Sequence, residues 1–282
     1  MTSAALPMAH ERSVRATSFQ AFKALLGRDL RVLAKTPVAF LLRTIMQPLL
    51  FTFVFSYVFP KIGQGIGGTA GRGGAAFSTV MVPGLIALAC IFQGVQAVAF
   101  PLTAEFSFTK EIEDRVLAPM PIWAVGVGKI ANGAAQAVFA AIIVFPIVAL
   151  VHARGQAPSI HIHNWFTLIA VMLLSSLLGA SFGLLIGSGV EPRQVPLVFS
   201  GLVLPMSMLG CVYYPWATLS SIAWLKYAVL INPLVYMSEG FRTALTPGSP
   251  HMRPIAFFLA MILATTLFAA TSLRAFRKRV VS

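Results

Sequence analysis

Charged side chains are scarce in this chain of 282 residues. Asp, Glu, Lys and Arg make up only 10% of the sequence, whereas 57% of the residues are hydrophobic. Soluble domains carry about 25% charged residues, so this chain has too few charges to cover a water-facing surface of its size. The composition therefore excludes a soluble domain and predicts an integral membrane protein, whose apolar side chains are solvated by lipid tails.

Acidic residues are the scarcest charges, with 8 Asp and Glu against 21 Lys and Arg and a net charge of +13. A strongly basic chain can bind nucleic acid. Here, however, the basic residues lie at the ends of apolar runs, a pattern typical of chains that contact anionic lipid headgroups. We therefore expect membrane lipid, and no nucleic acid, as a partner.

Motifs for metals and catalysis are also lacking. Cys90 and Cys211 both lie inside apolar runs, and their spacing fits neither a zinc site nor a disulfide framework. His161 and His163 form an HxH pair, but no acid or cysteine lies near them in the sequence. We expect two small core cysteines, a solvated histidine loop, no metal site and no catalytic residue.

Nucleotide-binding motifs are missing as well. The GVGK segment at 126–129 is not a GxxxxGK[ST] phosphate loop, because Trp123 replaces the first glycine and Ile130 replaces the Ser or Thr. The Gly-rich loop 60–77 lacks the GxGxxG fingerprint and is typical of a flexible linker. The sequence therefore predicts no cofactor bound by this chain.

Long apolar runs are the main feature that is present. Six runs reach the ~20 residues that a spanning helix needs, and no secretory signal precedes the first of them. We expect one all-α transmembrane domain over 1–282, with spans at 38–59, 78–101, 122–151, 165–187, 195–214 and 254–273. Fifteen of the 21 Lys and Arg fall on the side of the two termini, which predicts a plasma (inner) membrane protein with both termini cytoplasmic.

Two predicted cytoplasmic segments differ from the spans. In 18–36, apolar residues recur at helical spacing with basic residues between them, which favours an amphipathic helix lying in the headgroup plane over a helix packed on protein. The segment 105–121 holds half of all the acids. Its KEIEDRVLA stretch predicts a short charged helix that ends at Pro119. Such a helix suits docking of a soluble partner, and a solvated loop is the alternative.

The segment 213–246 is apolar but does not fit one span. We expect two short re-entrant outer helices that are separated at Asn232 and Pro233 and dip into the outer leaflet. Glu239 and Arg242 are three residues apart and are expected to pair on a helix surface. A seventh span at 222–241 is the alternative, but it would place the basic tail outside. The segment also carries residues typical of an interfacial aromatic belt: Tyr213, Tyr214, Trp216, Trp224, Tyr227 and Tyr236.

Two features of the spans bear on mechanism. Gly179, Gly183 and Gly187 form GxxxGxxxG, which leaves one helix face bare for another backbone. We expect helix packing within the subunit there, with a dimer contact as the alternative. Ionisable residues are almost absent far from the span ends, whereas ion-coupled transporters usually carry them. This absence favours an energy source outside the lipid.

Taken in order, these elements resemble the type 2 ABC exporter permeases, which include polysaccharide, lipo-oligosaccharide and daunorubicin-type drug exporters. The resemblance covers about residues 18–279. It is carried by the basic stretch 18–36, PLLFTFVFSYVF (48–59), KEIEDRVLAPMPIWAVGVGKI (110–130) and INPLVYMSEGFRTAL (231–245). The third resembles the coupling helix of this family, and the fourth its outer re-entrant pair.

The resemblance implies a half-transporter that pairs with a second permease copy, identical or similar. Two cytoplasmic ATPase subunits would dock on it and bind ATP and Mg²⁺. This chain lacks the fused ATPase and the long outer loop of many members, so a separate ATPase is expected. The implied ATPase contacts are Glu111, Glu113, Asp114 and Arg115. Tyr213, Tyr214, Pro215 and Trp216 would lie near an outer gate, and Glu239 and Arg242 would shape the outer helices.

We expect the cargo to be an amphipathic lipid-linked glycan or glycolipid. Drug or antibiotic efflux is the alternative, because aromatic-rich pores suit both cargoes. An intramembrane transferase would need clustered acids or a His–Asp pair at the membrane surface, and only the acids at 105–114 are candidates. A channel would need a repeated pore-lining pattern, which the sequence lacks.

Overall fold

A computed structural model gives the structure of the protein and describes residues 27, 28, 31, 35, 37–62, 77–109, 121–152, 158, 160–246, 248 and 250–281. All regular structure within these residues is helical, which confirms the all-α fold. Most of the predicted interfacial helix 18–36 lies outside the described residues. So does 110–120, the part of the coupling segment that holds Glu111, Glu113, Asp114, Arg115 and Pro119.

Five helical stretches are long and apolar enough to cross a membrane. The first joins α2 (Pro37–Thr52), η1 (Phe53–Val58) and α3 (Phe59–Lys61), and the second joins α4 (Phe77–Ala104) and η2 (Glu105–Thr109). The others are α6 (Ile122–Leu150), α7 (Trp165–Gly189) and α12 (Pro254–Val281). Their bounds lie close to five of the six predicted runs, so the chain is a multi-pass membrane protein.

The remaining predicted run, 195–214, forms a shorter helix than expected. Helix extends over η3 (Pro192–Gln194), α8 (Val195–Val198), η4 (Phe199–Val203) and α9 (Leu204–Met208) and then stops. Cys211 follows with a left-handed φ of 52°. A β-carbon at Gly210 would lie 2.4 Å from Leu234, so the chain turns through a position without room for a side chain. Apolar composition predicted a full span here, but the backbone leaves the helix early.

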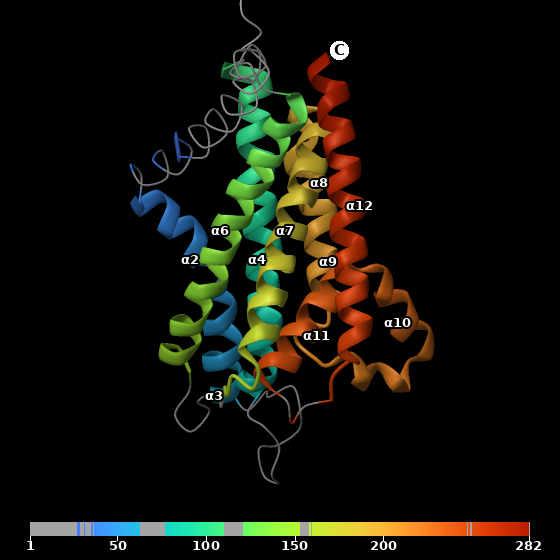
Figure 1. The fold of residues 1–282 in the computed structure, drawn as a ribbon. Coiled ribbons are helices and arrows are strands. Elements are labelled where there is room, and N and C mark those ends of the chain that lie inside the picture. The colour runs from blue at the N-terminus through green and yellow to red at the C-terminus, as the bar shows by residue number, and fades with distance from the viewer. Residues whose placement is uncertain are drawn as a thin grey trace, which may run out of the picture.

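The helices have two distinguishable ends in Figure 1. The C-terminus, the ends of α4 and α7 and the start of α6 lie together at the top, which we name the C-terminal end of the bundle. The opposite end holds α11 (Pro233–Leu245) and the start of α12, and we name it the α11 end. The Lys and Arg distribution predicts that the C-terminal end faces the cytoplasm.

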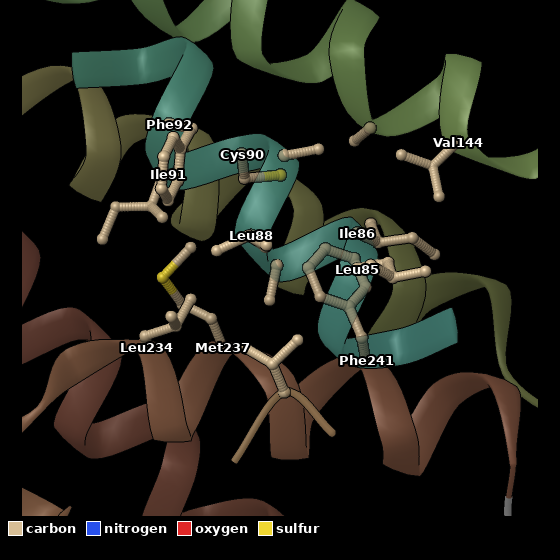
Figure 2. Packing of buried hydrophobic residues seen from close by; sticks show 14 of the residues in the cluster. Leu85, Ile86, Leu88, Cys90, Ile91, Phe92, Val144, Leu234, Met237 and Phe241 are labelled. Atoms are coloured by element: carbon tan, nitrogen blue, oxygen red, sulfur yellow. The ribbon is translucent and has the colours of Figure 1, made fainter. Parts of the chain in front are cut away.

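The hydrophobic core is centred on α4, whose apolar stretch is 83% buried. Figure 2 shows its side chains packed against Val144 of α6 and against Leu234, Met237 and Phe241 of α11. By contrast, only 17% of the apolar stretch of α12 is buried. Helix α4 therefore lies at the centre of the subunit, and α12 lies at the periphery of the subunit.

The GxxxGxxxG face of α7 packs directly on α4. A β-carbon at Gly179 would lie 2.8 Å from the Cys90 carbonyl oxygen, and one at Gly183 would lie 2.8 Å from the Val95 Cα. At Gly187 the nearest main-chain atom, the Ala99 Cα, would be 3.1 Å away. The glycine face is therefore occupied within the subunit, in agreement with the packing interpretation rather than a dimer contact.

Candidate functional site

The segment 213–246 folds as a chain of short helices. It comprises η5 (Trp216–Ser221), α10 (Ala223–Ala228), η6 (Val229–Ile231) and α11, with Asn232 between the last two. The Asn232 side chain accepts a hydrogen bond from the Leu234 N–H at 3.0 Å, and Pro233 occupies the first position of α11. Asparagine caps and a first-turn proline both favour a helix start. This break prevents a continuous helix over 222–241, the alternative seventh span.

Asn232 also ties α11 to the preceding helix, because its side-chain amide donates to the Met206 carbonyl of α9 at 2.7 Å. We predict that Asn232→Ala lowers the free energy of unfolding by about 1–2 kcal/mol, because the helix cap and this link are both lost. Thermal unfolding of the purified protein measures the effect. Thr266→Ala, at an exposed position of α12, is the control and should change stability little. Equal stabilities of the two variants would contradict the capping role.

Glu239 and Arg242 form an ion pair on α11, with 2.5 Å between Arg242 Nη1 and Glu239 Oε1. Both residues are fully buried, with 0% relative exposure. The pairing agrees with their spacing of three residues, and the structure adds that the pair lies inside the protein. Helix α11 packs between α4, α7 and α12, so its polar face points into protein.

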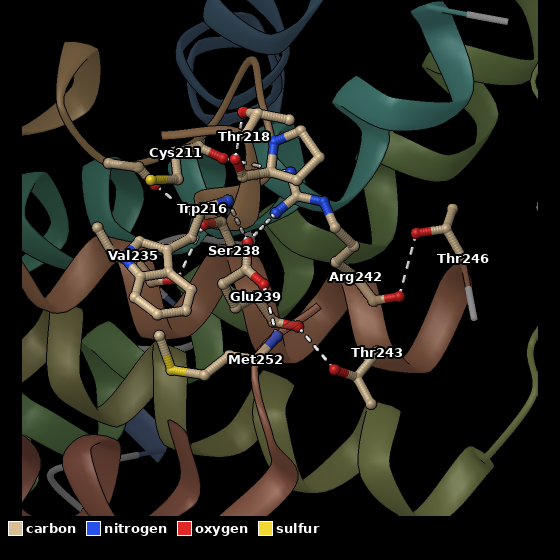
Figure 3. Close-up of polar contacts among 12 residues, drawn as sticks. Cys211, Trp216, Thr218, Val235, Ser238, Glu239, Arg242, Thr243, Thr246 and Met252 are labelled. Atoms are coloured by element: carbon tan, nitrogen blue, oxygen red, sulfur yellow. Dashed lines mark hydrogen bonds and ion pairs between the residues drawn. The ribbon is translucent and has the colours of Figure 1, made fainter. Parts of the chain in front are cut away.

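Three separate segments meet at this ion pair (Figure 3). Glu239 accepts the backbone N–H of Trp216 at 2.9 Å through Oε1 and that of Met252 at 2.9 Å through Oε2. Arg242 donates from Nη2 to the Cys211 carbonyl at 3.2 Å. We name Cys211, Trp216, Glu239, Arg242 and Met252 the outer clasp. Hydrogen bonds to charged groups are about twice as strong as neutral ones, so the clasp fixes the entry to η5 and the approach to α12.

The predicted gate residues divide between two places. Trp216 belongs to the outer clasp, and its indole N–H donates to the Lys226 carbonyl at 3.0 Å. Tyr213 instead packs against Phe55 of η1, with ring centroids 4.8 Å apart and ring planes tilted by 36°. Pro215 is buried and Tyr214 half-buried between them. The structure therefore brings Trp216 to Glu239 and Arg242. Tyr213 connects the segment 213–246, which we name the outer segment after its predicted position, to the first span.

A second ion pair lies at the C-terminal end of the bundle. Lys129 Nζ of α6 contacts Glu105 Oε1 of η2, and both side chains are about nine-tenths buried. The sequence does not predict this pair: Glu105 counts there only among the acids of 105–121, and Lys129 only as part of the GVGK segment. A lysine inside an apolar helix needs a partner, and that signal would have identified it.

Arg279 of α12 is a further residue that sequence reasoning did not single out. Its guanidinium lies 4.7 Å from the centroid of the Phe106 ring in η2. It also donates to the carbonyls of Ser188 and Val190 at the end of α7. Arg279 was interpreted as one of several topology-setting charges, whereas it binds two other helices. We name Phe106, Arg279 and these two carbonyls the inner latch.

Each end of the bundle carries an ion pair between buried side chains. In the described part of the chain no three His, Cys, Asp or Glu residues converge as a metal site. Among the described residues, the buried acids are Glu105 and Glu239, and each faces a basic partner. Such arrangements hold helices in register, and they also give discrete contacts that a conformational change can break.

Comparisons with known proteins agree with this architecture. The family model for the ABC-2 type transporter matches residues 20–246. The inner membrane transport permease YadH of Escherichia coli (strain K12) is 29% identical over 202 residues, which cover 71% of this chain and 74% of YadH. YadH of Escherichia coli O157:H7 and of Shigella flexneri gives the same values. Since the family model extends over most of the sequence, this chain belongs to the ABC-2 type transporter family.

Proposed function

We propose that this ABC transporter membrane subunit is an exporter permease that moves an amphipathic lipid-linked glycan or glycolipid out across the plasma (inner) membrane. The observation that carries the proposal is that Glu105 and Glu239, the acids buried in the described part of the chain, are both paired with basic residues inside an apolar bundle. A permease driven by protons or sodium usually binds the ion at an intramembrane acid. Here the two acids bind basic side chains of the protein instead of a transported ion. A partner ATPase would then supply the energy for transport.

The partner is proposed to be a cytoplasmic ATPase, present in two copies and docked on the coupling segment 105–121. ATP and Mg²⁺ would be bound by that partner. A second permease, identical or similar, would complete the pathway. The described start of the coupling segment supports this arrangement, because η2 is held by α6 through Lys129 and by α12 through Arg279. A push on this segment therefore reaches two spanning helices directly.

The docking proposal predicts the effect of reversing two charges. Glu113→Lys with Asp114→Lys should lower co-purification of the ATPase and uncouple ATP hydrolysis from transport, because acids that face a docking surface become like charges. Pull-down from detergent and ATPase assays measure these effects. Glu191→Lys is the matched control, since Glu191 is exposed in the loop after α7. An intact, fully coupled complex carrying both changes would refute the docking role.

Cargo class is tested with the reconstituted complex. A fluorescent glycolipid and an anthracycline drug are offered separately to proteoliposomes that contain the permease and its ATPase. ATP-dependent movement of the glycolipid alone supports the proposal. Movement of the anthracycline alone supports the alternative, a drug or antibiotic efflux permease. Exposed Trp224 and Tyr227 on α10 are compatible with both, because aromatic faces stack on sugars and on planar drugs.

A further inference from the structure

Helix α12 differs from the other long helices in its backbone composition. Its 28 residues contain no glycine, and its only proline is at the first position. The others are interrupted: Pro48 lies in α2, Pro83 and Pro101 in α4, and Pro146 in α6. Helix α7 carries the three packing glycines. Proline and glycine are the usual sites of helix bending. At 1.5 Å per residue, α12 is a stiff rod of about 42 Å.

One end of this rod is attached to the coupling segment. Arg279 lies over the Phe106 ring, and the Phe276 ring lies 6.4 Å from the same ring. Phe106 follows Glu105 in η2, the last described turn before 110–120. A displacement of the coupling segment therefore acts on α12 through an aromatic ring that two α12 side chains contact.

The other end is attached to the outer clasp. Met252, two residues before α12, donates its N–H to Glu239. One turn into the helix, Phe257 is fully buried, and a β-carbon at Gly240 of α11 would lie 3.3 Å from its ring. Between the two ends, α12 packs chiefly on α7, where the Phe182 and Phe268 rings are 5.1 Å apart. Most of its apolar surface faces away from the bundle, so α12 is held mainly along its α7 face and at its two ends.

We propose that α12 is a transmission strut between the coupling segment and the outer clasp, with Arg279 and the Met252–Glu239 contact as its two attachment points. Arg279 is thereby a positioning residue for transport, although it lies at the opposite end of the molecule from the clasp that it controls. The proposal rests on the proposed function for its biological role. The energetic coupling that it predicts between the two ends of α12 is a property of the permease alone and can be measured without the ATPase.

The alkylation rate of the native Cys211 thiol reports how often the outer clasp opens. The Cys211 carbonyl binds Arg242, and its side chain is fully buried while the clasp is closed. In a Cys90→Ala background, permease in lipid nanodiscs is treated with a maleimide and Cys211 alkylation is followed by mass spectrometry. Arg279→Met should raise the alkylation rate on the order of fivefold, the lower range of energetic coupling between distant sites. Arg277→Met, which removes the same charge from an exposed position two residues away, should leave the rate unchanged.

Two glycines introduced into α12 test whether this helix itself transmits the effect of Arg279→Met to Cys211. Thr266→Gly with Ala270→Gly places two glycines at exposed positions of α12 and leaves both attachment points in place. In this background Arg279→Met should no longer change the Cys211 rate. The matched control, Ala135→Gly at an exposed position of α6, should preserve the change. Should Arg279→Met not elute as a monodisperse species, Arg279→Lys replaces it, because lysine keeps a donor for the α7 carbonyls but loses the planar stack on Phe106.

Equal Cys211 rates in the Arg279 and Arg277 variants would overturn the strut. The strut would also be overturned if Arg279→Met still raised the Cys211 alkylation rate in full in the Thr266→Gly, Ala270→Gly background. The coupling would then follow a path other than α12. Neither measurement uses the ATPase or a cargo. Failure of the proposed export function would instead appear only in the reconstituted complex, so the two failures are distinguishable.

Discussion

Replacing Glu239 with alanine is expected to lower the free energy of unfolding by about 3–5 kcal/mol, the cost of removing one partner of a buried ion pair. The Arg242 guanidinium would remain fully buried without its counter-charge, and the N–H groups of Trp216 and Met252 would lose their acceptor. Thermal unfolding of the purified permease measures the loss. Faster alkylation of Cys211 should accompany it, because the outer clasp opens.

Two variants separate the charge from the rest of the site. Glu239→Met combined with Arg242→Leu should be less destabilised than Glu239→Ala, since no isolated charge remains in the interior. It should not recover fully, because Trp216 and Met252 still lack an acceptor. Glu191→Ala, at an exposed acid, should change stability by no more than about 0.5 kcal/mol. A Glu239→Ala protein as stable as Glu191→Ala would show that the clasp does not hold the outer segment.

The spans were predictable because length and apolar content alone define them. The runs that became α4, α6, α7 and α12 needed no knowledge of their neighbours. The run 195–214 shows where this reasoning stops. Its apolar composition continues to Tyr214, but the helix ends at Met208. The cause is tertiary: Leu234 of α11 fills the space beside Gly210, and the chain turns at Cys211.

The candidate site was predictable in part for a related reason. Helical spacing is local, so the pairing of Glu239 with Arg242 and the break at Asn232 could be inferred from adjacent residues. Burial of the pair could not, because it depends on which helices surround α11. The clasp partners Cys211, Trp216 and Met252 contribute only main-chain groups, which carry no sequence signature. A backbone N–H or carbonyl looks the same in every residue, so only the fold identifies it.

The contact between α7 and α4 leads to the second large effect. Gly183→Ala should lower the free energy of unfolding by about 3 kcal/mol, the upper end of the usual cost of overpacking. The added β-carbon would meet the Val95 Cα at 2.8 Å, the Val95 carbonyl oxygen at 2.9 Å and the Gly94 carbonyl oxygen at 3.0 Å. All three are main-chain atoms, so the helices must separate. Gly189→Ala, at the end of the same helix with no atom within 4 Å, is the control for thermal unfolding.

Second-site changes distinguish close approach of the α4 and α7 backbones from a general intolerance of buried glycine positions to an added β-carbon. At Gly133 of α6 the nearest obstacle is a side-chain atom, Val98 Cγ2, at 2.3 Å. Shortening that side chain with Val98→Ala should therefore restore much of the stability lost in Gly133→Ala. Val95→Ala should not rescue Gly183→Ala, because the obstructing Cα and carbonyl oxygen remain. Rescue at Gly183 as complete as at Gly133 would mean that side-chain crowding, rather than close approach of the two backbones, sets the spacing between α4 and α7.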